Sequence, residues 1–480
     1  MTDEPFASRI FNLGDQNAFA RLSSDWNPMH LDQAFARRTQ VGAPVVHGIH
    51  NLAWAANAVL QSCPLKVSNI RARFLQPLYL DEAAAVRIRD RTDGHIEFEI
   101  VAANTTVASV KLSSEPGKLA AKTAQLDSPA AIPISQPVDL PFEQLIGRTG
   151  AVAVTDADAL AWFPALTEAI GLSAVKALIA TSQIVGMACP GLHSLFAGLD
   201  VNREPDAERQ GALAYAVRKA DQRFRSLQID VWGSGIAGRL DAFARPAPPA
   251  QPGMAEIAGR VTGNPFAGQR SLVVGGSRGL GEVTAKIIAA GGGTPIITYR
   301  DSLQEAERIS SEIVRSGGKC EVLRYDALLP AAGQLQNLGA VDCCYYFATP
   351  KIFQRKSDLF EPDKLRAFLG FYADGFYNLC TALADGARKT AVFYPSTVAI
   401  DHGTSTTAEY AMAKAAGETL VTYVNAFTPN VQVVSRRLPR ILTDQTATVG
   451  VASADNALDV MLPIVYEVQQ MARPDTAPRG

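Results

Sequence analysis

A proline-rich run near the middle of the chain divides it into parts that are expected to fold separately. The run is Arg245–Gly253, RPAPPAQPG, in which four of nine residues are proline. Proline at this density cannot enter the interior of a helix or a sheet, so the run is predicted to be a semi-rigid tether. At 480 residues the chain is also too long for one ordinary core. We therefore predict two or three domains, with a change of architecture at the tether.

The composition excludes several classes of partner. Charged residues make up 19% of the chain and the net charge is −2, so electrostatics gives no case for nucleic acid or a membrane surface. No apolar run is long enough to span a bilayer, and Met1–Glu4 lacks the basic start of a secretion signal. The six cysteines show no paired spacing, which is typical of reduced thiols. We expect a cytoplasmic protein and predict no metal site.

An acid and an imidazole lie close together near the start of the chain. Asp25 and His30 are five positions apart, a spacing that shares no face of a helix or strand. The Asn27-Pro28 pair between them favours a turn that points both side chains into one pocket. Such a pair suits general acid and base catalysis. The structural alternative is that Asp25 and Asn27 only form a turn and that His30 caps the next helix.

The segment that follows supplies what this pair needs next. His47-Gly48 begins an apolar run, Ile49–Leu60, that is predicted to be a buried helix. The first backbone amides of a helix have no intrahelical acceptor, and Gly48 permits a close approach. These amides could therefore polarise a carbonyl oxygen.

Together, these residues resemble the signature of a known family. The MaoC-like (R)-specific enoyl-thioester hydratases and dehydratases of the hotdog fold share the pattern found here in Ser24-Asp25, Asn27-Pro28, His30 and Pro44-Val45-Val46-His47-Gly48. Ser24 stands where the family usually has glycine. The resemblance covers about the first hundred residues. It implies that Asp25 and His30 hold a water and move the protons, that the Gly48 amide stabilises the enolate oxygen, and that Asn27 contributes to the same site.

The rest of the N-terminal half fits an α+β architecture. Segments of alternating apolar residues within 67–112 predict an antiparallel sheet around the buried helix, so residues 1–115 are expected to form a hotdog domain. Residues 142–246 repeat this rhythm, with a helical stretch around 156–184 and strands after it. They contain no Asp, Asn-Pro, His cluster. We therefore predict a second, degenerate hotdog, and give the string Cys189–Ser194 a lining role rather than a covalent one.

Beyond a linker predicted over 247–268, residues 269–480 have the pattern of a different fold. A short apolar strand, Ser271–Val274, is followed by a glycine-rich turn and a helix over Glu282–Ala290. Further strands alternate with helices, which predicts an α/β Rossmann fold with a doubly wound parallel sheet. The glycine-rich turn and the strand ends after it are expected to bind a dinucleotide through Gly275, Ser277, Arg278, Gly279, Leu280, Gly281, Arg300 and Asp326.

Tyr410 and Lys414 define the chemistry expected of this half. Residues four apart lie on one helix face, so the ammonium can lower the pKa of the phenol and also reach a cofactor ribose. With the glycine turn, this pattern resembles the short-chain dehydrogenase/reductases over about residues 269–470. The resemblance implies that Tyr410 gives a proton to a carbonyl and that Lys414 assists it. The orienting hydroxyl belongs to Ser396 or to Thr397, which lies the usual thirteen residues before Tyr410.

Two features bear on the cofactor and on turnover. Arg278 in the glycine turn and Arg300 at the end of the second strand suit a 2′-phosphate, so NADP(H) is favoured over NAD(H). Three departures from the family pattern put turnover in doubt. The fourth strand ends in Phe347-Ala348-Thr349-Pro350 where the family commonly has Asn-Asn-Ala-Gly. Tyr372 takes a position that often holds an asparagine, and Arg440 replaces a glycine.

The leading hypothesis is a bifunctional enzyme that acts on acyl thioesters of coenzyme A or of an acyl carrier protein. The C-terminal half would reduce a 3-ketoacyl thioester with NADPH, and the N-terminal half would remove water from the product or add it back. Two alternatives are a reductase whose hotdog half only binds an acyl group, and an NADP-binding sensor or assembly protein without chemistry. Both families commonly form homo-oligomers, so an oligomer is expected.

Overall fold

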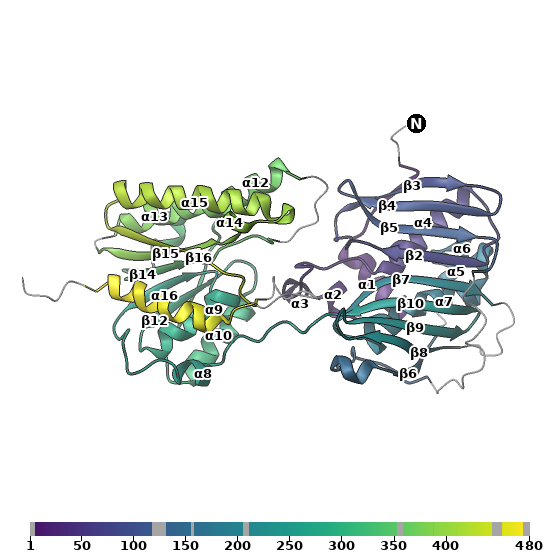
Figure 1. Cartoon of the computed structure of the whole chain (residues 1–480), viewed down its shortest axis with the longest axis horizontal. Helices are drawn as coiled ribbons and strands as arrows, with labels where there is room; N and C mark the ends of the chain where they lie inside the picture. The colour runs from purple at the N-terminus through teal and green to yellow at the C-terminus, as the bar shows by residue number, and fades with distance from the viewer. Residues whose placement is uncertain are drawn as a thin grey trace, which may run out of the picture. The chain divides into compact units, whose positions relative to one another are not determined.

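The structure is a computed structural model that describes residues 5–117, 131–154, 158–204, 211–352, 359–386, 388–443 and 454–473. The chain divides into two compact units, with the boundary between Ala247 and Pro248. We call them the N-terminal unit and the C-terminal unit and describe each by itself (Figure 1). Within the described residues, no single helix is long and apolar enough to cross a membrane; one bent pair, Pro164–Ile170 with Leu172–Ala188, passes that test only jointly.

The N-terminal unit contains one ten-stranded antiparallel sheet made of two halves. Two strands at its centre, one from each half, pair with each other and place Arg71 opposite Asp200, where the side chains form an ion pair of 2.7 Å. The predicted double hotdog is therefore one continuous sheet. In spatial order the strands are β1 (Ala7–Ile10), β3 (Ala83–Arg91), β4 (His95–Ala102), β5 (Thr105–Ser113), β2 (Asn69–Phe74), β7 (Ser194–Arg203), β10 (Ile236–Ala244), β9 (Ser226–Gly233), β8 (Ala212–Asp221) and β6 (Thr149–Ala153).

Each half of the sheet covers one long helix. Helix α4 (Gly48–Ser62) is apolar along most of its length and ends just before Pro64, which cannot continue a helix. Helix α7 (Leu172–Gln183) occupies the equivalent place in the second half. Both helices lie on the same side of the sheet in Figure 1, and their buried side chains belong to one hydrophobic core shared by the two halves.

The second half departs from the predicted pattern in two ways. The helical stretch expected around 156–184 is three helices, α5 (Ala159–Trp162), α6 (Pro164–Ile170) and α7, followed by a π-helical turn at Ile184–Ala188. Pro164 begins α6, and Gly171, with φ of 88°, separates α6 from α7 because only glycine adopts that conformation readily. Strand β7, which joins the halves, was not predicted, because Gly198 and the polar residues Asp200 and Asn202 weaken the strand pattern.

The C-terminal unit has the predicted doubly wound architecture, and the Rossmann fold is confirmed. Its six parallel strands lie in the order β13 (Glu321–Arg324), β12 (Thr294–Tyr299), β11 (Arg270–Val274), β14 (Cys343–Tyr346), β15 (Thr390–Thr397) and β16 (Val431–Leu438). Two cores cover the two faces of the sheet. Helices α9 (Gly279–Ala290), α10 (Leu303–Arg315) and α16 (Ala457–Met471) cover one face, and α12 (Pro362–Leu369), α13 (Phe376–Ala384) and α15 (Ala408–Phe427) cover the other (Figure 1).

The order of these strands fixes where a ligand can bind. The chain moves outward from β11 to β13 and then returns to place β14 on the other side of β11. In such sheets the connections diverge at this reversal and leave a crevice beyond the carboxyl ends of the strands. The glycine-rich turn after β11 lies at this position.

The tether is shorter than the linker predicted over 247–268. Helix α8 (Met254–Ala258) begins directly after the prolines, and Met254, Ile257 and Phe266 are buried in the core of the C-terminal unit. The start of this segment is held by Lys286, whose ammonium donates to the carbonyl of Pro252 over 3.2 Å. The segment that begins at Met254 therefore belongs to the Rossmann unit, because its apolar side chains pack into the core of that unit.

Lys286 provides a test of how the C-terminal unit is held together. Its ammonium, 2% exposed, lies 2.8 Å from Glu282 and 2.9 Å from Glu312. We predict that Lys286→Met lowers the free energy of unfolding of this unit by about 2–4 kcal/mol, because it leaves the buried carboxylate of Glu282 with only the half-exposed Arg308 as a cationic partner. Arg366→Met is the control, since its pair with Asp363 is exposed and worth about 1 kcal/mol or less.

The two units can be followed separately in a urea titration. All four tryptophans of the chain lie in the N-terminal unit, so their fluorescence reports that unit alone, whereas circular dichroism reports both. The expected result for Lys286→Met is an earlier transition by circular dichroism with an unchanged fluorescence transition. A fluorescence transition that moved by the same amount would contradict the assignment of this ion pair to a separately folding unit.

Candidate active sites

The predicted turn brings Asp25 and His30 into one buried place. Helix α1 (Leu13–Ser23) ends at Ser24, whose φ is 56°, and Asn27 then caps α2 (Pro28–Leu31) by accepting a hydrogen bond from the Met29 amide over 3.0 Å. Proline is favourable at the first position of a helix, so the Asn27-Pro28 pair both ends the turn and begins α2. The carboxylate of Asp25 is 2% exposed and His30 is 9% exposed.

Burial shifts the pKa values of the two groups in opposite directions. It raises the pKa of Asp25, although His30, Ser182 and the Asn27 amide act the other way. It lowers the pKa of His30, against the effect of Asp25. The Nδ1 atom of His30 lies 2.7 Å from the Val45 carbonyl, which can only accept, so Nδ1 carries a proton and Nε2 is available as a base. The site therefore favours an acid at Asp25 beside a neutral imidazole.

The second half of the sheet supplies one wall of this site. The hydroxyl of Ser182, on α7, donates to Asp25 Oδ2 over 2.7 Å, and the side chain of Asn27 donates to the carbonyl of Gly186 over 2.8 Å. A side-chain Cβ at Gly186 would lie 2.2 Å from Asp25 Oδ1, so only glycine fits there. Gly186 belongs to the π-helical turn, a feature common at functional sites. Neither Ser182 nor Gly186 was predicted, because no motif surrounds them.

His47 is a second buried imidazole in the same place. Its ring stacks on that of His30 with centroids 3.8 Å apart, and its Nε2 lies 3.9 Å from Asp25 Oδ2. Burial lowers the pKa of His47 well below its usual value. Ligand atoms of Asp25, His30 and His47 all lie within 4.8 Å of one another, close enough to hold a metal ion. That the site works without a metal stays a prediction.

Gly48 is the first residue of α4, directly after His47, which occupies the N-cap position without a side-chain capping hydrogen bond. The first amides of α4 therefore lie beside the imidazole pair and have no intrahelical acceptor. A Cβ at Gly48 would lie 3.2 Å from the ring of Phe74, so the ring leaves little space for a larger residue. The structure thus brings together all four residues predicted for this site: Asp25, His30, Asn27 and Gly48.

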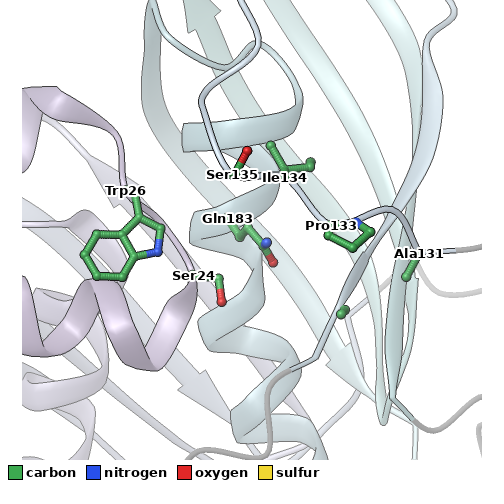
Figure 2. A pocket seen from close by; sticks show the side chains of 8 residues that line it. Ser24, Trp26, Ala131, Pro133, Ile134, Ser135 and Gln183 are labelled. Atoms are coloured by element: carbon green, nitrogen blue, oxygen red, sulfur yellow. The ribbon is translucent and has the colours of Figure 1, made fainter.

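A cavity of about 450 Å³ borders the residues on either side of Asp25. Figure 2 shows Ser24 and Trp26 on one side of it and Gln183, from the end of α7, beside them. Ser182 donates to Asp25, and the next residue, Gln183, lines the cavity. Asp25 is therefore close to the cavity but is not one of its lining residues. The lining combines apolar side chains with three polar ones, as in many sites for small organic ligands. Its residues are Ser24, Trp26, Ala131, Pro133, Ile134, Ser135, Ala153 and Gln183.

In the C-terminal unit the glycine-rich turn joins β11 to α9. Gly275 has φ of 77°, and a Cβ there would lie 3.0 Å from the backbone of Phe347. A Cβ at Gly281 would lie 2.3 Å from the carbonyl of Gly275, so the helix packs directly on the turn. The free amides at the start of α9 therefore lie at the crevice, where they fit the pyrophosphate of a dinucleotide. Ser277, Arg278, Gly279 and Leu280 lie in the same turn and first helical residues.

Tyr410, Lys414 and Thr397 lie together beside this crevice. Burial raises the pKa of Tyr410, and a hydrogen bond with Thr397 opposes that shift. Ser396, the alternative hydroxyl, instead donates to Glu418 over 2.5 Å. Of the two hydroxyls, the structure therefore pairs Thr397 with the tyrosine.

Lys414 differs from the expectation that its charge lowers the pKa of the phenol. Its ammonium donates to the Pro395 carbonyl over 2.6 Å, and burial lowers its own pKa to about 7. The nitrogen lies 3.9 Å from the centre of the Tyr372 ring, in a cation–π contact. The hydroxyl of Tyr372 is hydrogen-bonded to Thr349 over 2.5 Å. Two of the residues that depart from the family pattern, Tyr372 and Thr349, thus form the surroundings of Lys414.

The two arginines expected to recognise a 2′-phosphate lie next to the elements that border the crevice. Arg278 is the residue before α9, and Arg300 follows β12. Asp301 holds Arg300 through an ion pair of 2.8 Å and raises its pKa. Asp326 follows β13, and its carboxylate accepts from the Leu328 amide over 3.0 Å. Arg300 is therefore a permanent cation that must share its donors between Asp301 and a phosphate.

Comparisons with known proteins give a family for the N-terminal part of the chain and relatives for both halves. Residues 8–111 match the model of the MaoC like domain. The chain is 29% identical over 125 residues to the peroxisomal multifunctional enzyme type 2 of Mus musculus, covering 24% of this chain and 17% of that protein. It is 50% identical over 42 residues to the (R)-specific enoyl-CoA hydratase of Aeromonas caviae, covering 9% of this chain and 31% of the relative.

A third relative is an uncharacterized oxidoreductase of Escherichia coli, YgfF, with 41% identity over 56 residues, which covers 12% of this chain and 23% of that protein. The chain thus matches less than a third of the length of each of these relatives. Among solved structures, a 3-oxoacyl (acyl-carrier-protein) reductase of Agrobacterium tumefaciens with NADP bound aligns at 20% identity and a TM-score of 0.38, covering 42% of this chain and 88% of that one.

The family match and the two folds agree with the resemblance found in the sequence. The matched residues include Asp25, His30 and Gly48, and they end within β5 of the first hotdog half. The C-terminal unit has the strand order and glycine turn of a dinucleotide-binding fold. The chain therefore carries a MaoC-like domain at its N-terminus and joins it to a Rossmann-fold unit.

Proposed function

We propose that this chain is a bifunctional enzyme of acyl thioester metabolism: an NADPH-dependent 3-ketoacyl reductase joined to a 3-hydroxyacyl dehydratase that also hydrates enoyl thioesters. One observation carries the proposal: each unit places a proton-transfer group next to side chains that can assist it. The buried Asp25 lies with His30 beside the start of α4, and the partly buried Tyr410 is hydrogen-bonded to Thr397 at the carboxyl end of β15. The substrate would be an acyl thioester of coenzyme A or of an acyl carrier protein.

In the N-terminal unit the proposed chemistry assigns one proton transfer to each side chain. In the dehydration direction, His30 Nε2 accepts the proton from the carbon next to the thioester carbonyl, and Asp25, whose pKa is raised by burial, donates to the departing hydroxyl. The amides at Gly48 hold the carbonyl oxygen while it carries negative charge. Hydration reverses these transfers. The cavity lined by Ser24, Trp26 and Gln183 takes one end of the thioester.

In the C-terminal unit the proposed chemistry is reduction of a carbonyl. Tyr410 donates its phenolic proton to the carbonyl oxygen, and Thr397 orients that oxygen through its hydroxyl. NADPH, when bound, supplies the hydride. The amides at the start of α9, with Arg278 and Arg300, would hold its phosphates. Lys414, held by Pro395 and Tyr372, would contact the ribose and restore the proton to Tyr410.

The tether gives a physical reason to join the two activities. The product of the reductase is the substrate of the dehydratase, and a covalent link keeps each site at a high effective concentration near the other. The chain matches only part of the length of its relatives. The direction of flux, the acyl length, the cytoplasmic location and a homo-oligomeric state therefore all belong to the proposal. The buried Asp25 disfavours a purely acyl-binding hotdog half, and the Tyr410 site disfavours a sensor without chemistry.

A substitution of Asp25 tests the N-terminal site. We predict that Asp25→Asn slows hydration of crotonyl coenzyme A by at least about 100-fold, because the amide cannot transfer the proton. The loss of enoyl absorbance in the ultraviolet measures the rate. Asp93→Asn, at an exposed position of the same unit, is the matched control and is expected to keep its rate. Unchanged hydration in Asp25→Asn would remove the hydratase from the proposal.

A substitution of Tyr410 tests the C-terminal site. We predict that Tyr410→Phe slows oxidation of NADPH by acetoacetyl coenzyme A by at least about 100-fold while NADPH still binds, as measured by cofactor fluorescence. Tyr423→Phe, on the same helix but 59% exposed, is the control. If Tyr410→Phe oxidised NADPH at the native rate, the tyrosine would not be the proton donor.

A substitution of Arg300 tests the choice of cofactor. We predict that Arg300→Ala raises the KM for NADPH by about tenfold or more and leaves the KM for NADH nearly unchanged, because only NADPH carries the 2′-phosphate. Steady-state kinetics with each cofactor gives the ratio, with Arg315→Ala on α10 as the exposed control. An equal change in both KM values would contradict recognition of the 2′-phosphate by Arg300.

A further inference from the structure

Arg245, the first residue of the proline-rich run and the one directly after β10, has a buried side chain with unpaired nitrogens. It is 4% exposed, and its Nε and Nη2 atoms are buried without a hydrogen-bond partner. No described carboxylate forms an ion pair with it, and burial alone lowers its pKa to about 10. A buried guanidinium without a counter-charge costs several kcal/mol of stability. Because no described carboxylate offsets this cost, the side chain is suited to bind an anionic ligand.

The neighbours of Arg245 place it near the proposed hydratase site. Its amide donates to the carbonyl of His193 over 2.7 Å, at the end of the β7–β10 pair. Leu195, two residues after His193, packs against Met29 and Val45. Met29 precedes His30, and Val45 holds the His30 ring through its carbonyl. The positive charge of Arg245 accordingly acts on His30 and lowers its pKa, in addition to the effect of burial.

His193 adds a further buried nitrogen without a hydrogen-bond partner. Its Nδ1 atom is buried and makes no hydrogen bond, while its Nε2 atom lies 3.4 Å from Asp139. The cysteine of the same string plays a different part: burial raises the pKa of Cys189 to about 12, so it stays a thiol and is no nucleophile. The segment Cys189–Ser194 thus places the imidazole of His193 close to Arg245.

The two unpaired nitrogens of Arg245 indicate the kind of ligand. Nε and Nη2 form one edge of the guanidinium, and that edge binds two oxygens of a carboxylate or a phosphate at once. A thioester carbonyl offers only one oxygen and no full charge before the reaction. We propose that Arg245, assisted by His193, forms an anion subsite next to the hydratase pair that binds a carboxylate or phosphate group of the acyl thioester. This inference rests on the hydratase part of the proposed function.

Two parts of such a substrate could carry the anion. A carboxylate would belong to the acyl group, which would make the substrate a dicarboxylic acyl thioester. A phosphate would belong to the carrier arm. Two matched pairs of substrates separate these sources: glutaconyl against trans-2-pentenoyl coenzyme A, which differ by a carboxylate in place of a methyl group, and the pentenoyl thioester of coenzyme A against that of pantetheine, which lacks the phosphates.

The experiment compares hydration of these substrates by the native chain, Arg245→Gln and Arg245→Lys. If the anion is an acyl carboxylate, the ratio of kcat/KM for glutaconyl over pentenoyl coenzyme A falls at least about tenfold in Arg245→Gln. If it is a carrier phosphate, the ratio of coenzyme A over pantetheine thioester falls instead. Arg245→Lys keeps part of either preference, and Arg73→Gln, an exposed arginine on β2, keeps all of it.

Stability gives a readout independent of activity. Removing an uncompensated buried charge does not lower the melting temperature, so Arg245→Gln is expected to melt at or above the native temperature. Glutarate or inorganic phosphate should raise the melting temperature of the native chain but not that of the variant. Both substrate ratios unchanged in Arg245→Gln, with a lower melting temperature, would overturn the subsite and make Arg245 structural. A native chain that hydrates no thioester would overturn the hydratase itself, while the glutarate and phosphate titrations would still decide whether Arg245 binds an anion.

Discussion

The hydrogen bond from Ser182 to Asp25 is the contact on which the N-terminal unit depends for its chemistry. It joins the motif-bearing first half to a second half that has no catalytic motif of its own. Asn27 also donates to the Gly186 carbonyl, and Gly186 lies against the Asp25 carboxylate, so residues from both halves enclose that carboxylate. This enclosure is what raises the pKa of Asp25 and lowers that of His30. A single hotdog half would leave the carboxylate in water, where it would titrate as an ordinary acid.

Burial also governs the C-terminal unit, but through a cation. Lys414 lies against the Tyr372 ring and donates to a backbone carbonyl rather than to a carboxylate, so desolvation lowers its pKa to about 7. A lysine near neutrality can pass a proton on, which a fully charged one does poorly. The unusual Tyr372, which raised doubt about turnover, therefore has a defined place in the site. The same reasoning applies to Arg245, whose Nε and Nη2 atoms are buried without a hydrogen-bond partner.

Much of the fold could be predicted from the sequence, because its signals are local. The Asn27-Pro28 turn, the apolar helix after Gly48, the glycine turn after β11 and the Tyr410 and Lys414 spacing each depend on residues close in sequence. The misses are long-range. Strand β7 is stabilised by pairing with β2, 125 or more residues earlier, which no local pattern shows. Ser182, Gly186 and Arg245 become relevant only when the two halves are packed, and Met254 belongs to a core that begins beyond the tether.

One measurement tests the central claim that one chain carries out two successive steps on the same thioester. Purified protein is incubated with NADPH and acetoacetyl coenzyme A, the cofactor is followed by absorbance, and the thioesters are identified by mass spectrometry. The account predicts that NADPH is consumed and that 3-hydroxybutyryl and then crotonyl coenzyme A appear. NADPH that binds without being consumed, or a hydroxyacyl product that never yields the enoyl thioester, would contradict it.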